Sequence, residues 1–159
     1  MLRRCYDPKY HKNSPSYSEC TVCEEWKDFQ NFAEWYYNNI YNIQGEKICL
    51  DKDLLVKGNK VYSPDTCLLV PETLNKLVIN TANDNGKYPV GVNYHKHSKK
   101  YTSFLSTPNG RKCLGYFNTI EDAFITYKKA KEELILELAE NYKSLIPSIV
   151  YQALLSYEI

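Results

Sequence analysis

Three short runs rich in β-branched and aromatic residues, followed by one amphipathic segment, constrain the fold of this chain most. The runs occupy residues 90–94, 100–105 and 112–117, and turn residues separate them at 97–99 and 107–110. The second turn contains Asn109-Gly110, a strong hairpin signal. Thr119 precedes Asp122 by three residues, an arrangement that caps a helix. The pattern predicts a three-stranded antiparallel sheet packed on a long helix.

The predicted helix carries an apolar stripe that would cover the sheet, formed by Ala123, Phe124, Tyr127, Ala130, Leu134 and Leu138. We expect this helix to extend to about residue 142, to break at Pro147 and to resume over 148–157. Residues 134–159 contain more apolar side chains than a small sheet needs. This helical extension therefore either folds back on the core or forms an interface with a partner.

Charge is distributed unevenly along the chain. The formal net charge is only +1, yet residues 87–116 hold six Lys or Arg and not one carboxylate. Such a block is typical of a cationic surface that contacts the phosphate backbone of a nucleic acid. The alternative is a basic face that only water covers.

The N-terminal half has a mixed composition and predicts a separate domain. Residues 24–37 place aromatic side chains at helical spacing, 47–55 favour a short strand, and 71–77 favour a second short helix. Residues 81–86 are polar and aperiodic and lie where the net charge changes sign, so they form the predicted linker. The chain is therefore predicted to be α+β, with domains at 1–80 and 87–133 and the helical extension at 134–159.

Several motifs in the C-terminal half occur in the order known from one DNA-binding family: Gly86-Lys87-Tyr88-Pro89-Val90-Gly91-Val92, Lys99-Lys100-Tyr101, Gly110-Arg111-Lys112, Leu114-Gly115-Tyr116-Phe117 and Glu121-Asp122-Ala123. Over residues 87–131 the chain resembles the APETALA/ethylene-response-factor type of domain. That family folds as a three-stranded antiparallel sheet on one helix and reads the major groove with the exposed sheet face. The chain departs from it at Lys96, His97, Ser103 and Phe104, which leaves the target sequence open.

This resemblance implies that double-stranded DNA is the partner. A two-stranded ribbon fits the major groove, basic side chains neutralise phosphates, and tyrosine or serine side chains reach base edges or sugars. The predicted DNA contacts are Lys87, Tyr94, Lys96, Lys99, Lys100, Tyr101, Ser103, Arg111 and Lys112.

The N-terminal half carries a second set of motifs: Arg4-Cys5-Tyr6, Val22-Cys23-Glu24-Glu25-Trp26, Leu50-Asp51-Lys52-Asp53, Gly58-Asn59-Lys60 and Cys67-Leu68-Leu69-Val70-Pro71. Residues 2–77 resemble the N-terminal half of phage-encoded HNH-endonuclease-like proteins. In such enzymes two strands and a helix hold one divalent metal. The resemblance places Asp51 at the metal-ligand position, Lys52 at the general-base position, Asn59 at the loop asparagine and Thr66 at the last ligand position.

Two of these four positions hold residues with the wrong chemistry for a nuclease. Lysine carries a proton near neutral pH and is a poor base for activating water. Threonine is a weak ligand for Mg²⁺, which prefers carboxylates and water. Asp53 offers a second carboxylate beside Asp51 for Mg²⁺ or Mn²⁺. The resemblance therefore implies a degenerate, catalytically impaired HNH-like part.

Five of the six cysteines lie in the first 67 residues. Cys20 and Cys23 have the spacing of half a zinc knuckle, but no second Cys-x-x-Cys follows. Cys5, Cys23, Cys49 and Cys67 would complete a structural zinc site if the fold brings them together. The alternative is a set of buried free thiols that act as small hydrophobic residues.

Three functions stay open at this point. The first is a phage or mobile-element DNA-binding protein with an impaired HNH-derived domain. The second is an active, metal-dependent HNH homing-type endonuclease, and the third is a phage inhibitor that binds a host nucleic-acid enzyme or defence protein. No apolar run approaches the ~20 residues of a membrane span, and the first ten residues lack the apolar stretch of a signal peptide. We therefore expect no membrane partner and a location in the cytoplasm of a bacterial host.

Overall fold

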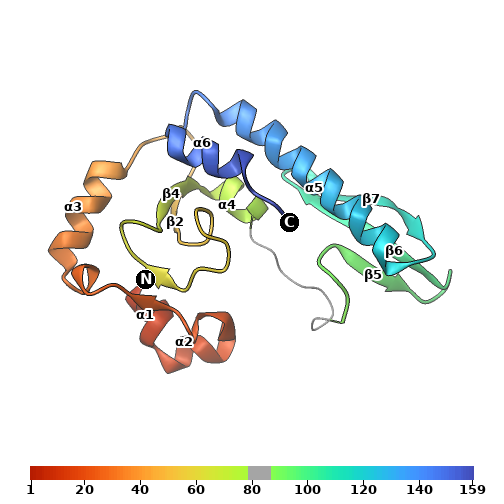
Figure 1. The fold of residues 1–159 in the computed structure, drawn as a ribbon, viewed down its shortest axis with the longest axis horizontal. Coiled ribbons are helices and arrows are strands. Elements are labelled where there is room, and N and C mark those ends of the chain that lie inside the picture. Colours follow the sequence, from red (N-terminus) through yellow and green to blue (C-terminus); the bar gives the residue numbers. More distant parts are fainter. Residues whose placement is uncertain (79–86) are drawn as a thin grey trace. The chain divides into compact units, whose positions relative to one another are not determined.

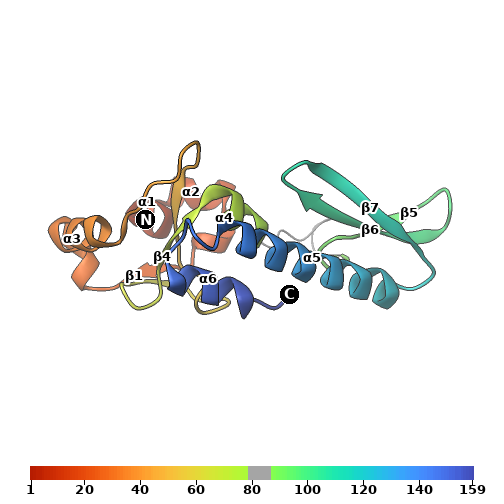
Figure 2. The ribbon, with the colours of Figure 1, turned by 90° about the horizontal axis from the view of Figure 1, so that it is seen from above.

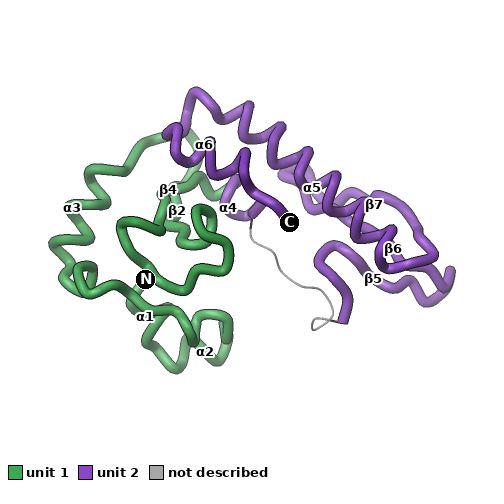
Figure 3. The backbone as a smooth tube through the Cα atoms, viewed as in Figure 1, with its two compact units in different colours: residues 1–72 green, residues 73–159 purple. Residues whose placement is uncertain are grey.

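The computed structural model describes residues 1–78 and 87–159 and divides the chain into two compact units. Unit 1 is Met1–Glu72 and unit 2 is Thr73–Ile159 (Figure 3). Helices and small sheets occur together, which confirms the predicted α+β class. The predicted linker, 81–86, lies outside the described residues, and the boundary between the units comes earlier in the chain. Among the described helices, none has both the length and the apolarity to cross a membrane.

Unit 1 consists of short helices and two small sheets. The helices are α1 (Leu2–Tyr6), α2 (Pro8–Asn13) and α3 (Phe29–Asn39), and the strands are β1 (Thr21–Val22), β2 (Ile48–Asp51), β3 (Val61–Tyr62) and β4 (Leu68–Pro71) (Figure 1). Strand β1 pairs in parallel with β3, and β2 pairs antiparallel with β4. Helix α4 (Glu72–Val78) follows β4 directly, and all of it after Glu72 belongs to unit 2.

Helix α3 begins later than the aromatic spacing predicts. Residues 25–27 form a 3-10 turn, and the Asp28 carboxylate accepts a 2.9 Å hydrogen bond from the Gln30 backbone N–H, which caps the helix. Trp26 is only 1% exposed, and its ring lies 5.1 Å from that of Phe32 and 4.7 Å from that of Trp35. These rings form one core with Cys5, Cys20, Val22, Tyr62 and Cys67.

Unit 2 contains the predicted sheet and long helix. Strands β5 (Val92–His95), β6 (Lys100–Thr107) and β7 (Gly110–Phe117) form an antiparallel sheet in sequential order. Thr107 pairs with Gly110, so Pro108 and Asn109 are the two loop residues of the hairpin that the sequence predicts. Helix α5 (Ile120–Tyr142) contacts all three strands, and α6 (Ser148–Leu155) packs against α5 (Figure 1, Figure 2).

Helix α5 has the predicted cap but a different buried stripe. The Thr119 hydroxyl accepts a 3.1 Å hydrogen bond from the Asp122 N–H and donates to the Asp122 carboxylate at 2.7 Å. The buried residues are Ala123, Tyr127, Lys131, Ile135 and Ala139. The predicted Phe124, Ala130, Leu134 and Leu138 are half-buried beside them. The prediction missed the centre of the stripe because Lys131 interrupts the apolar pattern, although a lysine can bury its methylene stem.

A close contact at Gly91 fixes how α5 lies on the sheet. Gly91 has a φ of +79°, and a Cβ at this position would lie 2.1 Å from the Tyr127 ring. Glycine is therefore needed both for the backbone conformation and for the approach of the helix. Next to this contact, Val92 and Ser103 are completely buried.

Gly91→Ala should lower the free energy of unfolding by about 2–4 kcal/mol, because it adds a steric clash to the cost of a positive φ. Gly110→Ala is the matched control in the same unit. Gly110 has a φ of +118° and no atom within 4 Å of the added Cβ, so only about 1–2 kcal/mol should be lost. Urea unfolding measures both values, and equal losses would contradict the proposed packing.

Lys131 predicts a dependence of stability on pH. Only 4% of its surface is exposed, and burial lowers the pKa of its ammonium group below the ordinary value of 10.5. The folded pKa is thus the lower one, so the unfolded chain binds more protons between the two pKa values and stability rises with pH there. Below both values the buried charge keeps its full desolvation cost.

Lys131→Met should therefore raise the free energy of unfolding at neutral pH by about 0.5–2 kcal/mol, the usual range for a stabilising substitution. The gain should shrink as pH rises towards the ordinary lysine pKa. Lys129→Met, at an exposed position of the same helix, should change stability by less than about 0.5 kcal/mol. Urea unfolding at several pH values tests this, and a loss of stability in Lys131→Met would refute it.

Candidate nucleic-acid interface

The register of the β5–β6–β7 sheet assigns each side chain to one of two faces. Directly opposed residues share a face, and successive residues alternate between faces. The completely buried Val92 and Ser103 are opposed, and they lie on the face that α5 covers. Two cross-strand rows belong to that face: Val92–Ser103–Gly115 and Tyr94–Tyr101–Phe117.

We call the opposite side of the sheet the outer face. It carries Asn93, His95, Lys100, Thr102, Phe104, Ser106, Arg111, Cys113 and Tyr116. The Arg111 Cζ lies 4.2 Å from the centroid of the Phe104 ring. The rings of His95 and Tyr116 meet edge to face, 5.5 Å apart and at 88°. Both polar groups are therefore supported by an aromatic ring of another strand, Arg111 by a ring of the adjacent β6 and His95 by a ring of β7, which limits their rotation.

A bulge in β7 brings two of these residues to the same face. Cys113 and Tyr116 are three positions apart, and in a regular strand they would point to opposite sides. Cys113 pairs with Phe104 and Gly115 pairs with Ser103, so Leu114 is the extra residue. The bulge thus places the Tyr116 ring on the outer face, where it contacts His95.

The turn between β5 and β6 holds His95 in one tautomer. The Ser98 backbone N–H donates to His95 Nδ1 at 3.2 Å, and the Ser98 hydroxyl lies 2.9 Å from the same nitrogen. Because Nδ1 accepts, the neutral ring carries its proton on Nε2, which leaves a donor available to a ligand. Lys100, the cross-strand partner of His95, is exposed, as are Lys96, His97 and Lys99 in the adjoining turn.

The structure leaves seven of the nine predicted DNA contacts exposed: Lys87, Tyr94, Lys96, Lys99, Lys100, Arg111 and Lys112. The prediction is wrong for Ser103, which is completely buried, and its hydroxyl finds no hydrogen-bond partner among the described residues. Tyr101 is half-buried on the α5 side, in ring contact with Tyr88 and Tyr94. Sequence reasoning missed His95, Phe104 and Tyr116 on the outer face. The alternation of strand residues could have identified this face. Leu105 is apolar and favours burial, and Tyr101 and Ser103 share its face because they lie four and two positions before it.

In unit 1, the four residues matched to the HNH motif lie between the end of β2 and the start of β4, and their side chains bond mainly to the backbone of this region. The Asn59 amide donates to the carbonyl oxygens of Lys52 at 2.8 Å and of Val61 at 2.7 Å. The Thr66 hydroxyl donates to the Val61 carbonyl at 2.9 Å. Asn59 therefore pins the loop as predicted, whereas the Thr66 hydroxyl is used by the fold.

Lys52 forms the centre of this loop. Its ammonium group donates to both Asp53 carboxylate oxygens, at 2.8 and 2.7 Å, and to the Asn59 carbonyl at 2.7 Å. The lysine side chain is only 8% exposed, while Asp53 is about half exposed. These three bonds use the donor capacity of the Lys52 ammonium group within the loop, so its side chain has a structural role here.

The Asp51 carboxylate also forms hydrogen bonds within this loop. One of its oxygens accepts hydrogen bonds from the backbone N–H groups of Asp53 at 2.8 Å and Leu54 at 2.7 Å. Burial raises the pKa of Asp51, against the lowering effect of these two bonds. With Asp53 paired to Lys52, both predicted metal ligands have a structural role in the loop.

The cysteines do not form the predicted zinc site. Cys5, Cys20 and Cys67 lie in the unit 1 core with Cys23 packed against it, whereas Cys49 lies on β2 outside this cluster. In the described ranges, 1–78 and 87–159, no three His, Cys, Asp or Glu residues gather in a way that could hold a metal. Burial raises the pKa of the Cys5 thiol and raises that of Cys67 to about 11. Buried free thiols in such a core act as small hydrophobic residues.

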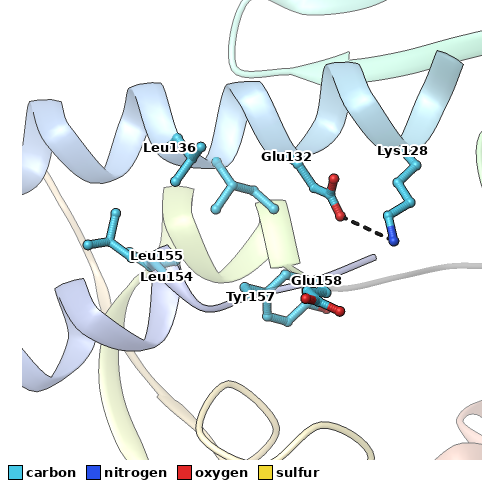
Figure 4. A pocket seen from close by; sticks show the side chains of 8 residues that line it. Lys128, Glu132, Leu136, Leu154, Leu155, Tyr157 and Glu158 are labelled. Carbon is cyan, nitrogen blue, oxygen red and sulfur yellow. Dashed lines mark ion pairs between the residues drawn. The ribbon is translucent and has the colours of Figure 1, made fainter. Parts of the chain in front are cut away.

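Unit 2 also has a pocket of about 300 Å³ between α5 and the C-terminal segment (Figure 4). Leu136, Leu154 and Leu155 supply apolar walls, and an ion pair of 3.6 Å joins Lys128 to Glu132 at its edge. The Tyr157 hydroxyl donates to the Val78 carbonyl at 2.8 Å, which holds the C-terminal segment in place.

Comparisons of this chain with protein-family models, with curated proteins and with solved structures found no match. Both resemblances identified in the sequence therefore stay predictions, and the function has to be argued from the geometry of the chain itself.

Asp51 allows a test of whether the loop is structural. Asp51→Ala removes the acceptor of two backbone N–H groups and should lower the free energy of unfolding by about 1–3 kcal/mol. Asp51→Asn keeps an acceptor oxygen and removes a buried charge, so it should cost less than about 1 kcal/mol. Urea unfolding at pH 7 distinguishes the two. Equal losses in both variants would show that the charge, rather than the two hydrogen bonds, holds the loop.

Proposed function

We propose that this chain binds double-stranded DNA through the outer face of the β5–β6–β7 sheet. The observation that carries the proposal is the Arg111 guanidinium, stacked 4.2 Å over Phe104 on a sheet face that α5 leaves free. The first carboxylate after this strand is Glu121, so residues 87–120 contribute only positive formal charge. A basic, acid-free surface of this kind attracts phosphates.

The two supported polar groups suit base edges in the major groove. A guanidinium binds guanine through two parallel hydrogen bonds, and the His95 Nε2–H donates one more. His95 and Arg111 lie opposite Lys100 and Ser106, six positions apart on β6. At about 3.3 Å per strand residue this distance is about 20 Å, or about six base pairs of duplex. The sheet therefore has the length for a short recognition site.

Unit 1 is proposed to have no nuclease activity. The Lys52 ammonium group donates three hydrogen bonds within the loop, and the Asp51 carboxylate accepts hydrogen bonds from two backbone N–H groups. The proposal thus favours the first sequence hypothesis, a DNA-binding protein of phage or mobile-element type with an inactive HNH-like part. Robust Mg²⁺- or Mn²⁺-dependent nicking of plasmid DNA that Asp51→Ala abolishes would favour the endonuclease instead.

The test of DNA binding removes three cations from the proposed surface: Lys99→Gln, Lys100→Gln and Arg111→Gln together. Each phosphate contact adds about −0.9 to the slope of log affinity against log salt, so the slope should flatten by up to about 2.7 units. The control is Lys128→Gln, Lys129→Gln and Lys143→Gln, which removes the same charge from α5 and the residue after it. Fluorescence anisotropy with a duplex measures both slopes, and equal effects in the two variants would refute the proposal.

Arg111→Lys tests base reading separately from charge. Lysine retains the positive charge but cannot form the two parallel hydrogen bonds of a guanidinium group. The difference in binding free energy between a duplex selected from a random pool and an unrelated duplex should therefore fall by about 1–3 kcal/mol. The salt slope should stay the same. An unchanged preference would mean that Arg111 contacts phosphate only.

A further inference from the structure

Charge is segregated within unit 1. Residues 1–17 contain four Lys or Arg and one carboxylate, whereas residues 18–46 contain one lysine and six carboxylates. The basic part forms α1 and α2, and it lies in a unit whose own formal charge is negative. We call the exposed Arg3, Lys9 and Lys12, together with Arg4, the α1–α2 patch.

The single carboxylate in this region does not neutralise the patch. One Asp7 oxygen accepts a 2.8 Å hydrogen bond from the Lys9 backbone N–H, which caps α2, and the other lies 3.4 Å from Arg3 Nε. The Arg3 side chain is nevertheless 78% exposed, so its remaining N–H groups face solvent. In the described part of the chain, the Lys9 and Lys12 ammonium groups have no carboxylate within ion-pair distance.

Aromatic rings support the two guanidinium groups. The Arg3 Cζ lies 5.7 Å from the Tyr10 ring and the Arg4 Cζ 5.6 Å from the Tyr17 ring, while the two rings meet edge to face at 5.8 Å. A 2.8 Å hydrogen bond between His11 Nε2 and the Arg4 carbonyl joins α1 to α2. The two guanidinium groups of the patch are therefore positioned by neighbouring rings.

From this arrangement we propose that the α1–α2 patch is a second DNA-binding surface, which contacts the phosphodiester backbone without reading bases. The proposal rests on the proposed function, since the duplex is the one that the outer face of the sheet binds. Cations on exposed helices give sequence-independent affinity and a dependence on salt. Unit 1 then serves DNA binding directly, by adding phosphate contacts to those of unit 2 and so raising the overall affinity.

The experiment uses the full chain with Arg3→Gln, Lys9→Gln and Lys12→Gln together, and leaves Arg4 in place. Fluorescence anisotropy with two duplexes of unrelated sequence should show a salt slope flatter by up to about 2.7 units, and the same fold loss of affinity for both duplexes. The matched control, Lys47→Gln, Lys57→Gln and Lys60→Gln, removes three exposed cations elsewhere in unit 1 and should leave the slope unchanged. If the triple variant melts at a lower temperature, Lys9→Gln with Lys12→Gln alone should still flatten the slope by up to about 1.8 units.

Failure of this inference is distinguishable from failure of the proposed function. A patch variant with wild-type binding, alongside the loss in the Lys99, Lys100 and Arg111 variant, would overturn the patch and leave the sheet interface standing. Equal losses of duplex affinity in the patch variant and the unit 1 control would also overturn it, because the lower net positive charge of the chain would then explain both losses. A wild-type chain that binds no duplex would overturn the proposed function and the patch together.

Discussion

The packing of α5 against one face of the β5–β6–β7 sheet decides which side chains a ligand can reach. Tyr127 approaches the backbone at Gly91, and Val92 and Ser103 are completely buried on the same face. Because strand residues alternate, this burial directs Phe104 and Arg111 to the opposite, solvent-facing side. The bulge at Leu114 then adds Tyr116 to that side. The packing of the core thus determines the outer face, where Arg111 and His95 each contact an aromatic ring of another strand.

The sequence was sufficient for the order of elements in unit 2 because its signals are local. The Asn109-Gly110 turn and the Thr119 cap depend only on residues close in the chain. Which residues form the interface depends on a helix that follows the sheet. The polar side chain of Ser103 predicts exposure, but the helix covers it. The charge of Lys131 likewise predicts exposure, yet the residue is buried, since a long side chain can be buried along most of its length.

In unit 1 the sequence predicted which residues meet but not what they do there. Asp51, Lys52 and Asn59 do come together on one loop. Their spacing could not reveal that Lys52 bonds to Asp53 and the Asn59 carbonyl, because hydrogen-bond partners depend on the backbone path of the loop. The predicted zinc site failed for a similar reason: Cys49 lies on β2, while Cys5, Cys20 and Cys67 fill the core around Trp26. The loop and the thiols therefore stabilise unit 1.

Cys113 provides the most direct test of the proposed interface. It is an exposed thiol on the outer face, opposite Phe104, and Cys23 and Cys49 are half-buried thiols of unit 1 that serve as internal references. The rate at which iodoacetamide alkylates each cysteine is measured by mass spectrometry with increasing duplex DNA. DNA binding by the outer face predicts that alkylation of Cys113 slows in proportion to the bound fraction and recovers at high salt, while Cys23 and Cys49 keep their rates. An unchanged Cys113 rate at saturating duplex would contradict the account.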